Sequence, residues 1–278
     1  SLKLTKENPV YEISYKKKFL VQESPLSFDF DNGYFGSNLK LGKVKSRKVD
    51  EYYDLVVGKA SHIRNHYKEV VIPLEETIAP YRKINLVVRA FNDGLGFRYE
   101  FPKQDNWTSY VMYDENTTFN LSGNPKTLTL FLPSYTSSHE GLYTHLNYSD
   151  IEPNKLMDMP TTFGFQDNMF MAITEAQLVD YAGMYLSKEN GLLKGKLSPY
   201  IGQEKIKVKA ELPHRSPWRV FMISDRVGAL IESNILTNLN DACKIEDTSW
   251  IKPGKATFPW WNGTVVPDTT FAPGNNFE

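Results

Sequence analysis

The 278-residue sequence is poor in three features that would point to particular classes of protein. Its single cysteine, Cys243, excludes an intrachain disulfide and any cysteine-based zinc cluster. It has no run of about 18 apolar residues, so we expect no transmembrane helix. Its 32 basic and 33 acidic side chains leave a formal net charge of −1. Nucleic-acid-binding scaffolds usually carry a basic excess, so this balance argues against that class.

Long amphipathic helical patterns are also scarce, and short strand patterns dominate instead. Aromatic residues, which favour strands, make up 13% of the chain. Alternating or apolar runs bounded by turn residues predict strands at 10–15, 19–21, 84–91, 95–101, 127–132, 205–212 and 218–223. Only short helices are expected, near 175–181 and 232–239. The spacing of the strands predicts an all-β fold of the β-sandwich type.

The composition changes near residue 245. About 30 residues follow this point, which is too few for a second domain of its own. We therefore expect one large domain followed by the beginning of another that is cut off. The first residues, Ser1 to Lys6, have the character of mature protein rather than of a secretion signal.

Five short blocks of sequence follow one another in a defined order. They are NDGLGFRYEFP (residues 92–102), AITEAQLVDY (172–181), SPWRVFMI (216–223), LIESN with LN (230–234 and 239–240), and DTSWIKPGK followed by two tryptophans (247–255 and 260–261). Each block alone is weakly specific. Together, up to about residue 262, they resemble glycoside hydrolase family 97, a family of α-glucosidases and α-galactosidases from gut Bacteroidetes and their relatives.

The resemblance implies an architecture of three parts. An N-terminal β-supersandwich, similar to galactose mutarotase, precedes a catalytic (β/α)8 barrel and a small C-terminal β-domain. Residues 1–246 would form the supersandwich, and residues 247–278 the linker and the first strand of a truncated barrel. The catalytic carboxylates of the family come from later barrel strands, so we expect no catalytic residue in this chain and no activity of the chain alone. The separation of those carboxylates decides between retention and inversion, which the sequence therefore leaves open.

Glu175 is the candidate metal ligand. In the family, the glutamate of the matching Ile-Thr-Glu-Ala block reaches into the barrel cleft and contributes to a calcium site, so the resemblance implies Ca²⁺ as a cofactor. Calcium prefers six to eight hard oxygen ligands, and a cation near the general acid would polarise the departing oxygen. From the residues alone, Glu175 is equally well interpreted as an acidic residue at the start of the short helix expected near 175–181.

Trp260, Trp261 and Asn262 are the candidate substrate-binding residues. They would lie at the C-terminal end of the first barrel strand, where the active sites of such barrels lie. An indole ring can pack against the C–H face of a sugar, and an asparagine amide can bond its hydroxyls. Neighbouring residues on a strand point in opposite directions, so one of the two tryptophans is expected to fill the barrel core. Pro259 is unusual inside a strand, and it leaves the substrate preference open.

Other charged and imidazole side chains have simpler interpretations. Arg98 and Glu100 alternate on a strand and are expected to form an ion pair. Arg219 is expected to bond carboxylates or carbonyls across the domain linker. His62 and His66 have the spacing of a metal site on a helix, but their solvated surroundings argue against one.

Three functions stay open at this point. The first is the N-terminal part of an exo-acting α-glycosidase, which removes a terminal α-linked glucose or galactose from oligosaccharides in the periplasm. The second is a β-sandwich that binds carbohydrate without catalysis. The third is a sugar mutarotase, in which His145 and Glu175 would have to act as acid and base; the linker-like block 247–255 argues against it. We expect no nucleic-acid partner, and the oligomeric state is open.

Overall fold

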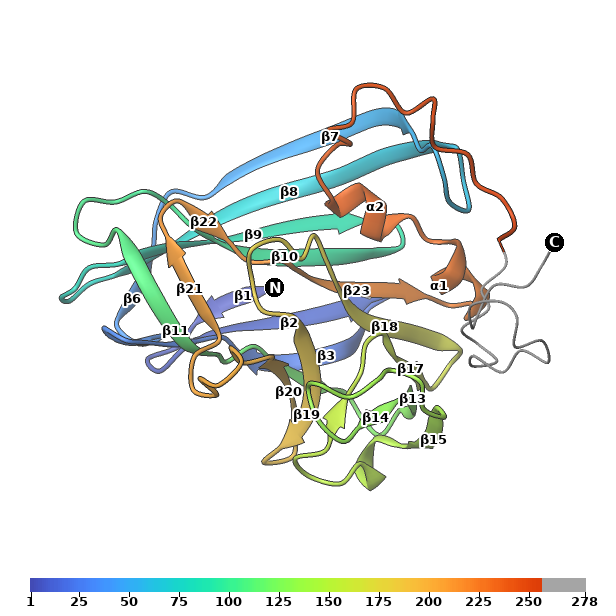
Figure 1. Cartoon of the computed structure of the whole chain (residues 1–278). Coiled ribbons are helices and arrows are strands. Elements are labelled where there is room, and N and C mark those ends of the chain that lie inside the picture. Colours follow the sequence, from blue (N-terminus) through green and yellow to red (C-terminus); the bar gives the residue numbers. More distant parts are fainter. Residues whose placement is uncertain (257–278) are drawn as a thin grey trace, which may run out of the picture. The chain divides into compact units, whose positions relative to one another are not determined.

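The computed structural model describes residues 1–256, and the chain divides into two compact units. Unit 1 comprises Ser1–Tyr53 and Ile63–Ala242. The described part of unit 2 comprises Asp54–His62 and residues 243–256, and the latter segment contains no helix or strand. Unit 1 is built almost entirely of antiparallel strands (Figure 1). The prediction of an all-β sandwich is therefore confirmed.

The strands of the described residues form three sheets. An eight-stranded sheet contains, in spatial order, β1 (Leu2–Leu4), β2 (Pro9–Tyr15), β3 (Lys18–Pro25), β12 (Thr118–Leu121), β20 (Leu192–Leu197), β19 (Met184–Glu189), β16 (Leu156–Met157) and β14 (Phe131–Leu132). A four-stranded sheet contains β21 (Val208–Glu211), β11 (Ser109–Glu115), β4 (Phe28–Phe30) and β5 (Gly33–Phe35).

The largest sheet has eleven strands within the described residues. Its order is β15 (Thr144–Asn147), β13 (Lys126–Thr129), β17 (Thr161–Phe165), β18 (Met169–Ala176), β23 (Trp218–Ser224), β10 (Gly94–Phe101), β9 (Lys83–Phe91), β8 (His62–Glu76) and β6 (Leu39–Leu41), with β22 (His214–Arg215) beside β10 and β7 (Lys45–Asp54) beside β8. Two five-residue helices, α1 (Gly228–Glu232) and α2 (Ile235–Leu239), follow β23 (Figure 1).

The main hydrophobic core fills the space between the sheets. Aromatic rings meet across it: Tyr11 of β2 lies 5.2 Å from Phe97 of β10, and Phe119 of β12 lies 5.7 Å from Phe221 of β23. These rings belong to different sheets, so their burial joins the two layers. Packed aromatic pairs contribute roughly 0.5–1.5 kcal/mol each beyond the area that they bury.

A second, smaller core lies on the other face of the large sheet. Trp218 and Val220 of β23 pack there with Ile235 and Leu239 of α2. Strand β23 is therefore covered on both faces, because its alternate residues enter the two cores. This explains why its sequence is a continuous apolar run instead of an alternation.

Most of the strand predictions and one of the two helix predictions are confirmed. Both predicted hairpins are present, as the antiparallel strand pairs β2–β3 and β9–β10. The predicted strand 127–132 is divided between β13 and β14, which belong to different sheets. The helix expected at 175–181 is wrong: β18 runs to Ala176, and an irregular loop follows. The pattern near 232–239 gives two short helices, with Ser233 and Asn234 between them.

Helices in the described part of the chain are short. None of them is long and apolar enough to cross a membrane.

Candidate functional site

Glu175 lies on a strand, directly opposite an arginine on the neighbouring strand. In the antiparallel register of β18 and β23, Glu175 pairs with Arg219. Both side chains point to the inner face of the large sheet, because their neighbours Ala176 and Trp218 belong to the outer core. The interpretation of Glu175 as the first residue of a helix is therefore wrong. Strand register, not helix geometry, fixes its position.

Arg219 is completely buried and binds two carboxylates at once. Its Nε and Nη2 donate to the two oxygens of Glu115 at 2.8 and 2.7 Å, and its Nη1 donates to Oε2 of Glu175 at 2.8 Å. This bidentate geometry is the arrangement for which a guanidinium is suited. The expectation that Arg219 bonds across the domain linker is wrong, because both of its carboxylate partners lie inside the sandwich.

The buried network carries an uncompensated negative charge. Two carboxylates share one guanidinium, and the remaining donors are neutral: Tyr181 donates its hydroxyl to Glu115 at 2.7 Å, and Thr117 donates to the same carboxylate at 2.8 Å. Burial raises the pKa of Glu175, although Arg219 opposes this shift. A cation approaching Glu175 would therefore be attracted to the network.

Glu175 retains the capacity to bind a further partner. Its Oε1 accepts a hydrogen bond from the Met184 N–H at 3.1 Å, and its Oε2 accepts the bond from Arg219. Each carboxylate oxygen has a second lone pair, and the side chain is 14% exposed. The side chain thus fits the role of one oxygen ligand of a hard cation. Within residues 1–256, however, no three His, Cys, Asp or Glu side chains are grouped as a metal site.

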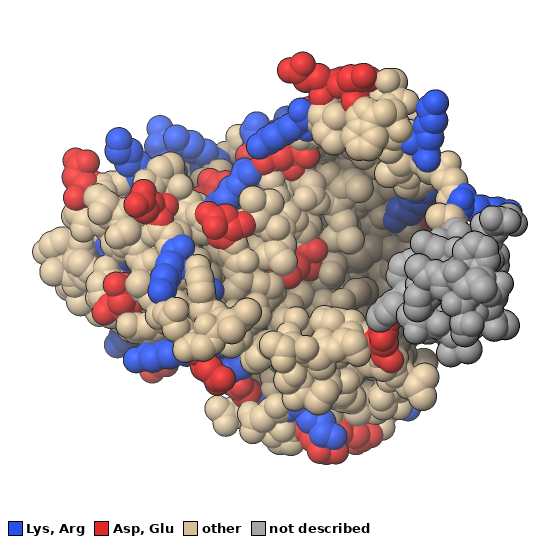
Figure 2. All heavy atoms as spheres, viewed as in Figure 1, with Lys and Arg blue, Asp and Glu red and all other residues tan. Residues whose placement is uncertain are grey.

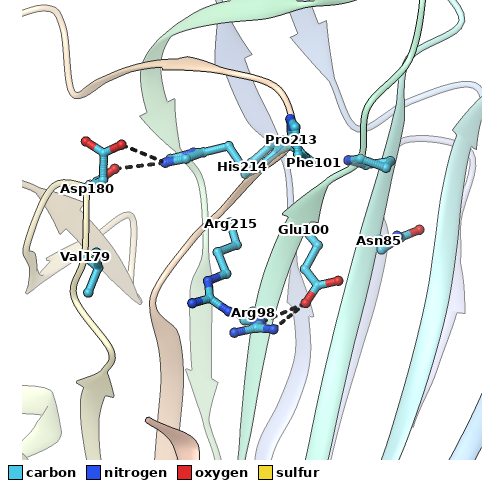
Figure 3. A pocket seen from close by; sticks show the side chains of 10 residues that line it. Asn85, Arg98, Glu100, Phe101, Val179, Asp180, Pro213, His214 and Arg215 are labelled. Carbon is cyan, nitrogen blue, oxygen red and sulfur yellow. Dashed lines mark hydrogen bonds and ion pairs between the residues drawn. The ribbon is translucent and has the colours of Figure 1, made fainter. Parts of the chain in front are cut away.

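A separate pocket of about 430 Å³ is lined by residues of β9, β10, β22 and the loop that follows β18 (Figure 3). Arg98 and Glu100 of β10 line it and form the predicted ion pair, with Arg98 Nε 3.0 Å from Glu100 Oε1. Arg98 also donates to the Gln177 side chain, in the loop that follows β18, at 3.3 Å. The same loop contributes Val179 and Asp180 to the pocket. The loop that follows β18 therefore forms part of the pocket wall.

His214 of β22 holds this loop in place. Its Nε2 lies 3.0 Å from the Asp180 carbonyl oxygen, and its Nδ1 lies 2.7 Å from the Tyr110 hydroxyl. A neutral ring with the proton on Nε2 satisfies both contacts. The ring also stacks on Tyr181, with the ring centroids 5.9 Å apart. Figure 3 shows His214 facing Asp180. No local pattern in the sequence marks this residue, because all its partners are distant in sequence.

We expect His214 to make the stability of the sandwich sensitive to acid. Burial lowers its pKa in the folded state, below the value of about 6.5 in an unfolded chain. As the pH falls, His214 of the unfolded chain takes up a proton before His214 of the folded chain does. The contribution of neutral His214 to the free energy of unfolding is therefore complete above about pH 6.5 and is lost as the pH falls through the folded-state pKa. Urea unfolding between pH 8 and 5 should show a steeper loss for the wild type than for His214→Gln. Equal slopes would contradict this assignment.

The structure does not bring the proposed mutarotase pair together. His145 of β15 lies in the same row of paired residues as Ala172 of β18. Leu128 of β13 and Thr162 of β17 stand between them. Three strand spacings of about 4.8 Å separate β15 from β18, and Glu175 lies further along β18. The two side chains are therefore too far apart for shared acid–base chemistry.

The remaining predicted residues lie elsewhere. His62 and His66 are on strand β8, where a separation of four residues corresponds to about 13 Å, so the helical metal spacing does not apply. Trp260, Trp261 and Asn262 lie outside the described residues. Over the face shown in Figure 2, acidic and basic side chains are interspersed, and they do not gather in patches of one sign.

Comparison with known proteins gives consistent matches. Residues 1–242 match the family model described as "Glycosyl-hydrolase 97 N-terminal". A retaining alpha-galactosidase of Bacteroides thetaiotaomicron is 26% identical over 297 residues, covering 96% of this chain and 43% of the relative. A probable retaining alpha-galactosidase of Streptomyces bingchenggensis is 26% identical over 259 residues, covering 91% of this chain and 37% of the relative.

Solved structures agree with these matches. A glycoside hydrolase family 97 enzyme from Pseudoalteromonas sp. strain K8, in complex with acarbose, superposes with a TM-score of 0.86 at 28% identity, covering 94% of this chain and 39% of that one. A beta-arabinopyranosidase, at 23% identity and a TM-score of 0.72, shares the fold over 81% of this chain and 38% of its own. The chain thus spans about two fifths of the length of these relatives.

Proposed function

Since the chain belongs to glycoside hydrolase family 97 and corresponds to the N-terminal portion of its members, we propose that it forms one wall of the active site in an exo-acting α-glycosidase. The substrate would be an oligosaccharide with a terminal α-linked glucose or galactose. Support comes from the relatives: two are named as retaining alpha-galactosidases or probable ones, and one Pseudoalteromonas structure is a complex with panose.

The observation that carries this proposal is the state of Glu175. It lies at the end of β18, is partly exposed, and belongs to a network with one uncompensated negative charge. A cation bound to Glu175 would neutralise this charge. We therefore propose that Glu175 contributes one ligand to a calcium ion whose other oxygen ligands come from outside residues 1–256. When bound, calcium would supply positive charge near the departing oxygen of the glycoside.

The proposal includes that this chain is inactive by itself. Glycoside hydrolysis needs two carboxyl groups that flank the scissile bond. In the buried network, Glu115 and Glu175 both bind Arg219 and Glu115 is fully buried, so the two do not form a pair that can flank a glycosidic bond. The catalytic pair would therefore come from the rest of the protein, as would the sugar contacts proposed for Trp260, Trp261 and Asn262.

The test is hydrolysis of nitrophenyl α-glucoside and nitrophenyl α-galactoside by the full-length protein, with and without a calcium chelator. We expect one of the two substrates to be hydrolysed, and the rate to fall by about 10- to 100-fold in Glu175→Gln, as is typical for loss of a group that supports a metal. The matched control is Glu232→Gln, which removes an exposed carboxylate of α1 whose ion pair within residues 1–256 is with Arg226.

The outcomes separate the parts of the proposal. Activity that is lost with chelator and in Glu175→Gln, but kept in Glu232→Gln, supports both the glycosidase and the calcium ligand. Activity that is indifferent to the chelator and to Glu175→Gln would overturn the calcium ligand alone. Absence of hydrolysis of either substrate by the folded protein would overturn the glycosidase.

A further inference from the structure

An aspartate–histidine pair lies in the segment between β14 and β17. Nδ1 of His139 lies 2.7 Å from Oδ2 of Asp158. Asp158 is itself fixed, because its Oδ1 accepts a hydrogen bond from the Met159 N–H at 2.8 Å and its own N–H donates to the Leu130 carbonyl at 2.9 Å. The carboxylate thus orients the imidazole, and it places the proton of a neutral ring on Nδ1.

The other imidazole nitrogen is left for a partner. Within residues 1–256, Nε2 of His139 forms no hydrogen bond, and the side chain is 47% exposed while that of Asp158 is only 16% exposed. His214 differs, because both of its nitrogens are bonded inside the protein. The pair of His62 with Asp54 differs as well, because both of those side chains are largely exposed to solvent. His139 therefore combines a fixed ring with an available acceptor.

Two tyrosine rings stand beside this imidazole. The ring of Tyr185 lies 6.0 Å from that of His139, and Tyr135 meets Tyr185 edge to face at 5.2 Å. Both tyrosines are half-buried. An aromatic surface next to one oriented polar group suits a pyranose, whose C–H face packs on a ring while a hydroxyl bonds the polar group.

The pair lies at the same end of the sandwich as Glu175. Tyr185 directly follows Met184, whose N–H donates to Glu175. The pKa of Tyr185 is raised mainly by burial, and then by the negative charges of Asp158 and Glu175. Two adjacent residues of β19 thus contact the two groups: the Met184 N–H bonds Glu175, and the Tyr185 ring lies beside His139.

We propose that His139 binds the saccharide substrate, with Nε2 accepting a hydrogen bond from a pyranose hydroxyl and Asp158 holding the ring in position. The proposal rests on the proposed function, because it takes the sugar near Glu175 to be the substrate. In this arrangement His139 is a binding residue and Asp158 a positioning residue. Tyr185 and Tyr135 form the apolar side of the same subsite.

The decisive variant is His139→Asn in the full-length protein. An asparagine amide can replace Nδ1–H and keep the bond to Asp158, but it has no atom at the place of Nε2. A structural role predicts nearly unchanged kinetics for this variant. The binding role predicts that kcat/KM falls about 10-fold, mostly through KM, in keeping with the loss of one hydrogen bond of about 1–1.5 kcal/mol. The control is His66→Asn, which removes an exposed imidazole of β8.

Nitrophenyl glycosides that each lack one sugar hydroxyl identify the hydroxyl that bonds Nε2 of His139. For the wild type, deleting the hydroxyl that His139 binds should lower kcat/KM about 10-fold. For His139→Asn the same deletion should have almost no further effect, whereas deletions at other positions should act equally on both proteins. Effects that are additive at every position would overturn the proposal, and so would unchanged KM in His139→Asn.

A binding measurement distinguishes failure of the proposed hydrolase function from failure of the inference about His139. If the wild type hydrolyses neither nitrophenyl glycoside, binding of the same two compounds is measured by calorimetry. A Kd that rises about 10-fold in His139→Asn but not in His66→Asn supports the binding residue without the hydrolase. A Kd that does not change in His139→Asn, or the absence of binding to the wild type, overturns the inference.

Discussion

Replacement of Arg219 by methionine is expected to destabilise the sandwich by about 3–5 kcal/mol, because it leaves two buried carboxylates without their shared counter-charge. Methionine has nearly the volume of the arginine side chain, so the loss would reflect charge more than packing. All three guanidinium nitrogens donate to Glu115 or Glu175, and the arginine is completely buried. Urea unfolding of the chain at pH 7.5, followed by tryptophan fluorescence, measures the effect.

The dependence on pH distinguishes a charge effect from a packing effect. Burial raises the pKa of Glu175 and Arg219 opposes this shift, so without Arg219 the folded-state pKa should rise further above the unfolded value, and stability is lost as the pH rises through that range. The difference from the wild type should therefore be largest near neutral pH and should shrink towards pH 4. The control is Arg226→Met, which breaks an exposed pair with Glu232 and should leave the urea midpoint nearly unchanged. A deficit of Arg219→Met that is the same at pH 4 and pH 7.5 would contradict the charge explanation.

Substitution of Gly94 by alanine is expected to have a comparable effect for a different reason. Gly94 begins β10 with φ of +153°, a conformation that residues with side chains rarely adopt. A Cβ atom there would lie 2.1 Å from the backbone oxygen of Phe221 in β23, so the two central strands would have to separate. Strain and overpacking together should cost about 3–5 kcal/mol. Thermal unfolding and soluble yield measure the loss.

Gly191 provides the matched control for Gly94. It also has positive φ, +82°, in the turn between β19 and β20, but an added Cβ would meet nothing within 4 Å. Gly191→Ala should therefore cost only the backbone strain, about 1 kcal/mol. Equal losses in the two variants would show that strain alone, rather than the contact with Phe221, limits position 94.

The sequence predicted those parts of the fold that depend on neighbouring residues. The alternation within 205–212 and the turn residues Asn92 and Asp93 report local backbone geometry, and β21 and the β9–β10 hairpin are found there. The helix expected at 175–181 failed because Glu, Ala, Gln and Leu favour helices by themselves. Pairing of β18 with β23 outweighed that preference, since propensities are small beside tertiary contacts.

The candidate site could be predicted only in part. The family resemblance singled out Glu175, and a strand pattern suggested the Arg98–Glu100 pair. Nothing near residue 175 indicated Glu115, which is 60 residues earlier and is joined to it only through Arg219. The pairing of His139 with Asp158 was equally hidden, because a bend of the chain that is not encoded in any motif brings the two together.

The central position of β23 has a consequence for synthesis of the protein. This strand lies between β18 and β10, yet it is the last strand of the sheet to be made, ending at Ser224. Until the ribosome has released it, both of its neighbours carry unpaired edges and uncovered apolar residues, which favour aggregation. A nascent chain that ends before Trp218 therefore lacks the strand that joins the two halves of the sheet. Chaperone binding to the emerging polypeptide should persist until that point and fall soon after it.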